Sequence, residues 1–192
     1  MTAILSLLIK SAIVDNVVFI QYLAICPFIG MTSETDKAAG MGIATSFVIV
    51  LATAVTWPIY KLIMVPLHLE FLQTLMFILV IASLVQLVEF FLKKSIPGLY
   101  KSMGVYLALI TTNCAVLGVT INCISKNYNY GYSLVYALGT ALGFLLSMVI
   151  MSGVRSRIKT AKIPKAFQGT PILFIAAGLL SLAFLGFKGL IK

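Results

Sequence analysis

Charged side chains are scarce in this sequence. Only 10% of its 192 residues are Asp, Glu, Lys or Arg, and just five are acidic, whereas 61% are hydrophobic. A soluble globular domain of ordinary composition is therefore excluded. Apolar stretches of the roughly 20 residues that cross a bilayer fill most of the chain. We expect one transmembrane domain over residues 1–192, with no separate soluble domain.

Motifs for nucleotide and hydrolytic chemistry are also missing. The sequence has no GxGxxG after a strand, no Walker motif, no HExxH and no GxSxG. Nucleotide and flavin chemistry must therefore occur elsewhere. The single histidine, His68, lies in a predicted polar loop beside Pro66, and we expect no catalytic part for it. Three cysteines are too few for a disulfide scaffold.

Apolar runs between charged breaks predict about six transmembrane helices. They lie at 3–29, 38–60, 71–92, 99–124, 132–154 and 171–187. The loops of such a chain alternate between two faces. One face holds nine basic residues: Lys37, Lys93, Lys94, Lys101, Arg155, Arg157, Lys159, Lys162 and Lys165. The other holds five: Lys10, Lys61, Lys126, Lys188 and Lys192. By the positive-inside rule both termini face outward, and this asymmetry explains the net charge of +9 without a nucleic-acid partner.

Two similar motifs interrupt the first and fourth predicted spans, CPFIG at 26–30 and CAVLG at 114–118. Small residues that permit close helix contact follow in the next span of each half: Gly40, Gly42 and Ala44, then Gly139 and Gly143. The chain therefore reads as a three-plus-three repeat, roughly 1–95 and 96–192. An odd number of spans in each half makes this repeat inverted. The expected fold is an all-α integral membrane protein of six transmembrane helices.

The first predicted span is too long for one straight helix, and Pro27 with Gly30 supplies a break. We expect a broken helix at each motif, with Cys26 and Cys114 at similar depth in the middle of the bilayer. A cysteine in an apolar helix is usually only a small hydrophobe. Matched positions in an inverted repeat favour a ligand pair instead, and thiolate suits iron–sulfur clusters, copper or zinc.

Two cysteines cannot complete a cluster with four thiolate ligands, so a second chain would have to supply the rest. Cys123 lies outside the repeated motif and is predicted to serve packing alone. Asn113, with Thr111 and Thr112, has two interpretations that the sequence leaves open. These residues either donate hydrogen bonds to cluster sulfurs or cap the broken helix.

Ionisable residues within membrane spans are candidates for function. Lys10 can extend toward the outer interface, and Glu89 lies four residues before Lys93 on the same helix face. Asp15 has no evident partner, so we predict that it matters more than Glu89 to assembly or ion coupling.

Two classes of function fit these features. One is a membrane electron-transfer subunit that carries a shared metal cluster. The alternative is a small-solute secondary transporter that uses its broken helices as the binding site. The iron and sulfide content of the purified protein discriminates between them.

Around the cysteine motifs the sequence resembles the A subunits of the Rnf ferredoxin:NAD oxidoreductase complexes. These are related to the D and E subunits of the sodium-pumping NADH:quinone oxidoreductase. The likeness covers essentially the whole chain, and residues 26–30, 111–118 and 176–184 carry it. Val119 favours A over the paralogous Rnf E subunit, which typically has arginine there. Ala24 and Ala108 stand where relatives often have glycine and proline, and both favour straighter helix.

The resemblance implies a subunit of the bacterial cell membrane that pairs with its inverted paralogue, the E subunit, and shares a 2Fe–2S cluster with it. It implies Cys26 and Cys114 as metal ligands, with Thr112 and Asn113 beside them. Complexes of this family pass electrons from ferredoxin to NAD through flavins and iron–sulfur centres on other subunits. This transfer drives Na⁺ or H⁺ across the membrane, and the chain would be one relay in that path.

Overall fold

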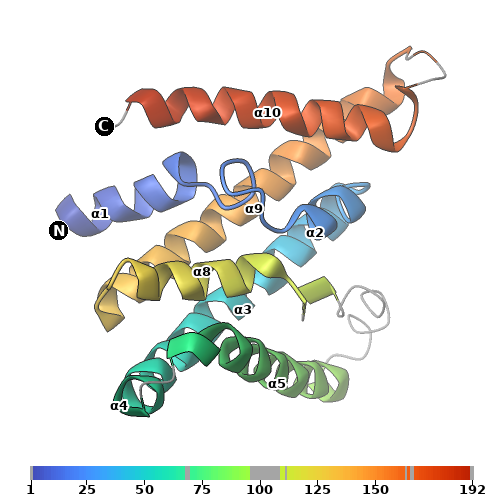
Figure 1. Ribbon diagram of the computed structural model, residues 1–192. Helices are drawn as coiled ribbons and strands as arrows, with labels where there is room; N and C mark the ends of the chain where they lie inside the picture. Colours follow the sequence, from blue (N-terminus) through green and yellow to red (C-terminus); the bar gives the residue numbers. More distant parts are fainter. Residues whose placement is uncertain are drawn as a thin grey trace.

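The computed structural model describes residues 2–67, 70–95, 109–110, 112–162, 164 and 167–190, and all regular structure in this part of the chain is helical (Figure 1). The expectation of an all-α fold is therefore confirmed. The elements are α1 (Thr2–Ile9), the π-helical turn η1 (Lys10–Val14), α2 (Ile25–Gly30), α3 (Thr35–Ile59), the π-helical turn η2 (Tyr60–Met64), α4 (Val65–Leu67), the 3-10 turn η3 (Glu70–Leu72), α5 (Gln73–Ser95), α8 (Cys114–Ser125), α9 (Tyr130–Thr160) and α10 (Thr170–Leu190).

Four helices in the described part of the chain are long and apolar enough to cross a membrane. They are Thr35–Met64, Gln73–Phe90, Tyr130–Thr160 and Thr170–Phe187. Each contains most of a predicted span. Thr35–Met64 and Tyr130–Thr160 extend a few residues beyond the predicted spans 38–60 and 132–154. Two shorter apolar helices are Ile4–Val14, which lies within the first predicted span, and Cys114–Ser125, which ends one residue beyond the fourth.

The long helices α3 and α9 form the centre of the molecule and pack along each other. Ser46 of α3 donates a hydrogen bond to the Ala141 carbonyl of α9 at 3.0 Å. Gly42 faces Leu145 of α9, where an added Cβ atom would lie 3.4 Å from Leu145 Cγ, an ordinary van der Waals contact that does not itself require glycine. Gly40 was predicted to permit close helix contact, but nothing lies within 4 Å of a Cβ atom at that position, so that prediction is wrong.

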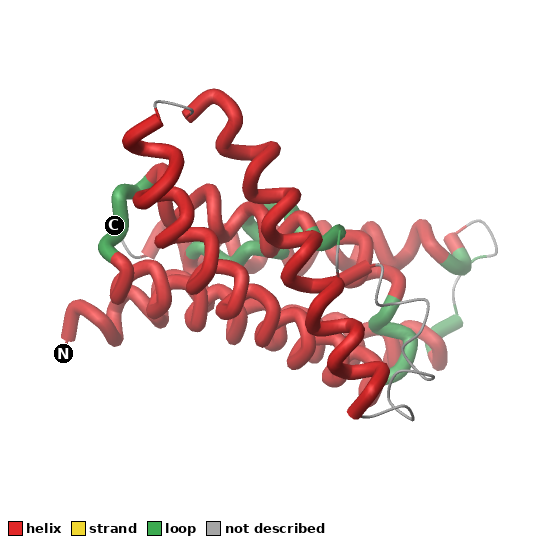
Figure 2. Tube along the Cα trace, turned by 90° about the horizontal axis from the view of Figure 1, so that it is seen from below, coloured by secondary structure: helices red, strands yellow, loops and turns green. Residues whose placement is uncertain are grey.

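The remaining helices cover the two sides of this central pair (Figure 1). α1, η1 and α10 pack on the side of α9, and α5 and α8 pack on the side of α3. The start of α1 and the end of α10 lie at one end of the bundle in both views (Figures 1 and 2).

The first predicted span is broken, and the break precedes the cysteine motif. The helix ends at Val14, residues 15–24 are not helical, and α2 begins at Ile25. The predicted break at Pro27 is therefore wrong. Pro27 lies in the first turn of α2, where its missing N–H has no intrahelical partner to lose.

The fourth predicted span also breaks at its motif. Leu109 and Ile110 are helical, Asn113 has extended backbone angles, and α8 begins at Cys114. Residues 99–108 and 111 of this span lie outside the described residues, Ala108 and Thr111 among them.

Gly139 and Gly143 let the first helix approach the backbone of α9, as the sequence predicts. A Cβ atom on Gly143 would lie 2.5 Å from the carbonyl oxygen of Ala12 and 3.0 Å from its Cα. A Cβ atom on Gly139 would meet Ser11 Oγ and, at 2.9 Å, the Leu8 carbonyl oxygen. Backbone atoms cannot rotate away from an added methyl group. The first helix can therefore pack this closely against α9 only if both positions are glycine.

We expect Gly143→Ala to lower the thermal stability of the purified protein, since the added methyl overpacks the contact at a cost of about 1–3 kcal/mol. Gly153→Ala is the matched control, because Gly153 lies on the same helix with nothing within 4 Å of its position. There the better helix propensity of alanine stabilises or leaves the melting temperature unchanged. Equal melting temperatures for the two variants would contradict the close packing of η1 on α9.

Candidate functional site

The two motif cysteines occupy equivalent places in the structure. Cys26 is the second residue of α2, and Cys114 is the first residue of α8. Each thiol thus lies at the start of a short helix that follows a break. Both side chains are exposed in the isolated chain. Among the described residues no three His, Cys, Asp or Glu side chains gather as a metal group, so these thiols have no further ligands of that kind beside them.

A hydrogen bond connects the two motifs directly. The backbone N–H of Ala24, two residues before Cys26, donates to Cys114 Sγ at 2.9 Å. Ala24 caps α2 in the left-handed conformation, with φ 62° and ψ 32°. The prediction that alanine here favours straighter helix is therefore wrong. This backbone turn directs the N–H of Ala24 toward the sulfur.

Asn16 organises the break in the first span, and sequence reasoning missed it. Its side chain is fully buried. The amide nitrogen donates at 3.0 Å to two carbonyl oxygens, those of Ala12 and Gly143. The amide oxygen accepts from three donors: Val18 N at 3.0 Å, Phe19 N at 3.3 Å and Ser147 Oγ at 3.0 Å. The signal in the sequence was an amide within an apolar run, directly after Asp15.

Helix α10 holds the other side of residues 15–24. Ser181 donates to the Phe19 carbonyl at 2.5 Å and lies 2.8 Å from the Tyr22 hydroxyl. The Phe19 ring stacks on Phe184 at 4.5 Å and meets Phe28 of α2 edge-on at 5.6 Å. Polar contacts therefore satisfy the open backbone, while aromatic contacts fix α2 against α10.

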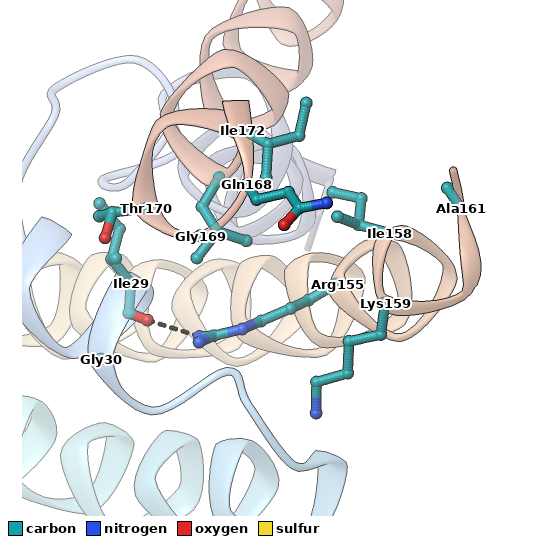
Figure 3. Close-up of a pocket in the computed structure, with 11 residues that line it drawn as sticks. Ile29, Gly30, Arg155, Ile158, Lys159, Ala161, Gln168, Gly169, Thr170 and Ile172 are labelled. Carbon is teal, nitrogen blue, oxygen red and sulfur yellow. Dashed lines mark hydrogen bonds between the residues drawn. The ribbon is translucent and has the colours of Figure 1, made fainter. Parts of the chain in front are cut away.

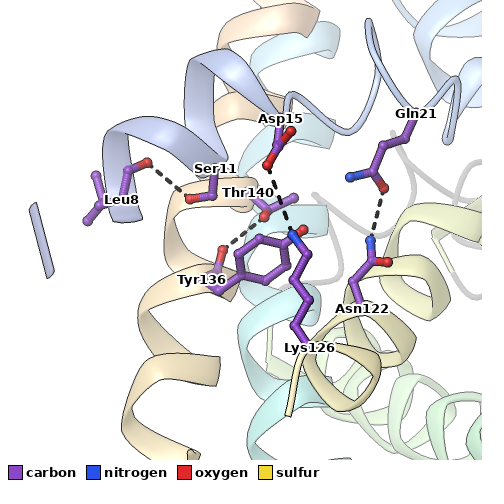
Figure 4. Close-up of polar contacts among 8 residues, drawn as sticks. All are labelled: Leu8, Ser11, Asp15, Gln21, Asn122, Lys126, Tyr136 and Thr140. Atoms are coloured by element: carbon purple, nitrogen blue, oxygen red, sulfur yellow. Dashed lines mark hydrogen bonds and ion pairs between the residues drawn. The ribbon is translucent and has the colours of Figure 1, made fainter. Parts of the chain in front are cut away.

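Asp15 and Gln21 connect the broken segment to α8 and the turn after it (Figure 4). Asp15 Oδ2 lies 3.9 Å from Lys126 Nζ, and Asn122 Nδ2 donates to Gln21 Oε1 at 3.0 Å. The premise that Asp15 lacks a partner is therefore wrong. Its side chain is 24% exposed, so the ion pair is partly solvated and weak. Lys93, the predicted partner of Glu89, lies outside the described side chains.

The other residues that the sequence analysis singled out near the cysteine motifs differ in their burial and in their contacts. Asn113 caps α8, because its side-chain oxygen accepts from Ala115 N at 3.0 Å. Its Nδ2 is buried without a hydrogen-bond partner among the described residues. Thr112 is exposed beside it. Cys123 is 1% exposed and donates only a long contact, 3.8 Å, to the Ser133 carbonyl. This environment suits packing.

Comparison with known proteins identifies the family of this chain. The family model described as "Rnf-Nqr subunit, membrane protein" matches residues 4–191. The chain belongs to the Rnf-Nqr family. The A subunit of the ion-translocating oxidoreductase complex of Syntrophotalea carbinolica is 49% identical, over 100% of this chain and 99% of the relative. The protein of the same name from Cronobacter sakazakii is 46% identical over 100% of both chains.

A further Rnf-Nqr relative, from Acetobacterium woodii, is named as the A subunit of a Na(+)-translocating ferredoxin:NAD(+) oxidoreductase complex. It is 48% identical over 96% of each chain. The resemblance to A subunits that the cysteine motifs indicated is therefore confirmed.

We expect Asn16→Asp to destabilise the protein by about 3 kcal/mol or more. The substitution replaces the amide donor with a carboxylate oxygen that faces two carbonyl oxygens in a buried site. Asn129→Asp is the matched control, since Asn129 is exposed and caps α9 through its oxygen, which aspartate retains. Thermal unfolding of the two variants tests the assignment. Similar stability would show that the Asn16 amide does not hold the break.

Proposed function

We propose that this chain is the A subunit of an ion-translocating ferredoxin:NAD oxidoreductase complex and carries electrons within the membrane. Near-complete coverage at 48–49% identity to proteins with such names supports the assignment. The absence of nucleotide motifs from the sequence agrees with a relay rather than a site of hydride transfer.

In this proposal Cys26 and Cys114 hold one half of a 2Fe–2S cluster. Two soft sulfur donors, both exposed and linked through the Ala24 N–H, suit an iron–sulfur centre. The cluster supplies one-electron chemistry when bound. A second chain must contribute the remaining ligands, because the described residues offer no third ligand in a metal group. The inverted paralogue, the E subunit, is the partner that the family resemblance implies.

The residues around the thiols would tune this site. Ala24 N–H already donates to Cys114 Sγ, and the Nδ2 of Asn113 is a buried donor that has no partner in the described part of the chain. Hydrogen bonds to cluster sulfurs stabilise the more negative, reduced state. The capping oxygen and the amide nitrogen of Asn113 are different atoms. The Asn113 side chain thus caps α8 through its oxygen, and in this proposal it also donates to a cluster sulfur through its nitrogen.

We also propose that the chain forms six spans as an inverted repeat with both termini outside. Several observations support it: a break that precedes each cysteine motif, the pairing of α3 with α9, and the two chain ends at one end of the bundle (Figure 1). The basic residues that follow α9 would then face the cytoplasm.

The cysteines provide the decisive experiment. We expect Cys26→Ser and Cys114→Ser each to abolish the 2Fe–2S absorption and EPR signals of the chain co-purified with its paralogue. Electron transfer stops, while the flavins of other subunits remain. Cys123→Ser is the matched control and retains the cluster, since Cys123 is buried away from the motifs.

Serine is nearly the size of cysteine, so a packing role at any of the three sites would cost only modest stability. Iron-free preparations of the two chains, or intact cluster spectra in both ligand variants, would reject the electron-relay function. The secondary transporter, which uses the same broken helices, would then be the better assignment.

The variant Asn113→Ser distinguishes an effect on the cluster potential from the capping of α8. Serine keeps a capping oxygen but removes the amide donor. We expect the cluster to assemble with a lower midpoint potential in a redox titration monitored by EPR. The control Asn129→Ser makes the same change at the cap of α9, and the potential stays at the wild-type value. An unchanged potential in the Asn113 variant would restrict this residue to helix capping.

A further inference from the structure

A cavity of about 690 Å³ opens where α9 ends and α10 begins, beside the end of α2 (Figure 3). Its lining combines two cations, Arg155 and Lys159, with the apolar side chains of Ile158, Ile172 and Leu173. Both α9 and α10 are long enough to span a bilayer. Their adjoining ends therefore place the cavity at a membrane–water boundary, on the face richer in basic residues.

Among the described residues, the hydrogen bonds of the two cations go to neutral oxygens. Arg155 Nη1 donates to the Ile29 carbonyl at 2.7 Å and to Thr32 Oγ1 at 3.3 Å. Lys159 Nζ donates to the Ser33 carbonyl at 2.9 Å. Within the described residues the ion pairs join Lys37 to Glu34 and Lys126 to Asp15, so no carboxylate neutralises Arg155 or Lys159.

We propose that this cavity binds the phosphate group of an anionic phospholipid. Guanidinium binds phosphate with strong, charge-assisted hydrogen bonds, and basic pockets between transmembrane helices suit anionic headgroups. The apolar walls formed by Ile158, Ile172 and Leu173 favour a lipid over free phosphate, because they can contact the start of the acyl chains.

The contact between Arg155 and the Ile29 carbonyl connects this cavity to α2. Ile29 lies in the last turn of α2, whose first turn carries Cys26. Arg155 thereby satisfies a carbonyl at the end of that helix that lacks a helical partner. A headgroup on Arg155 would lie next to the short helix of the proposed cluster ligand, although binding itself does not depend on the cluster.

The test uses the purified complex, incubated with vesicles of phosphatidylglycerol and phosphatidylcholine and then analysed for bound lipid by native mass spectrometry. We expect wild-type protein to retain phosphatidylglycerol, and Arg155→Gln to bind it at least about tenfold more weakly. Arg157→Gln is the matched control. It removes the same charge from an exposed position on α9 outside the cavity and retains the lipid.

Three outcomes would overturn the proposal. Equal loss in both arginine variants would indicate diffuse attraction to the membrane, and equal retention would exclude this cavity. If inorganic phosphate at millimolar concentration displaces the lipid or binds as well without it, the site takes free phosphate. Should Arg155→Gln fail to assemble, Arg155→Lys against Arg157→Lys repeats the comparison. Lysine keeps the charge but loses the planar donor pair, so the lipid again binds more weakly only at position 155.

Discussion

Residues 15–24 leave the helix among apolar side chains, where each unpaired backbone group costs several kcal/mol. The buried amide of Asn16 removes much of that cost with one side chain. It accepts from the backbone N–H groups of Val18 and Phe19 and donates to the carbonyls of Ala12 and Gly143. The same group thus ends the first helix, begins the open segment and attaches both to α9.

The open segment then runs along α8 in the opposite direction. Asp15 lies beside Lys126, Gln21 bonds Asn122, and Ala24 bonds Cys114. These contacts follow the whole length of α8 and bring the start of α2 to the start of α8. The convergence of the cysteine motifs is therefore a consequence of how the broken segment is held, and not of a direct contact between the two thiols.

The sequence predicted the helical class, the long spans and the two breaks because hydropathy and the Cys-x-x-aliphatic-Gly repeat report them directly. It placed the first break wrongly, because Pro27 does not interrupt a helix but lies in the first turn of α2. Asn16, Ser181 and Arg155 act through partners more than 120 residues away in the chain. No local pattern contains such contacts, and for the same reason Lys126 was not recognised as the partner of Asp15.

Ala24 illustrates how the whole fold outweighs a local preference. A left-handed conformation costs an L-residue about 1–2 kcal/mol, yet Ala24 adopts it while fully buried. Its carbonyl accepts from Phe28 N at 3.2 Å, and the preceding Leu23 N donates to the Val17 carbonyl at 3.1 Å. These bonds on both sides fix the peptide in its strained conformation. The N–H that donates to Cys114 Sγ is thus held in place by the backbone itself.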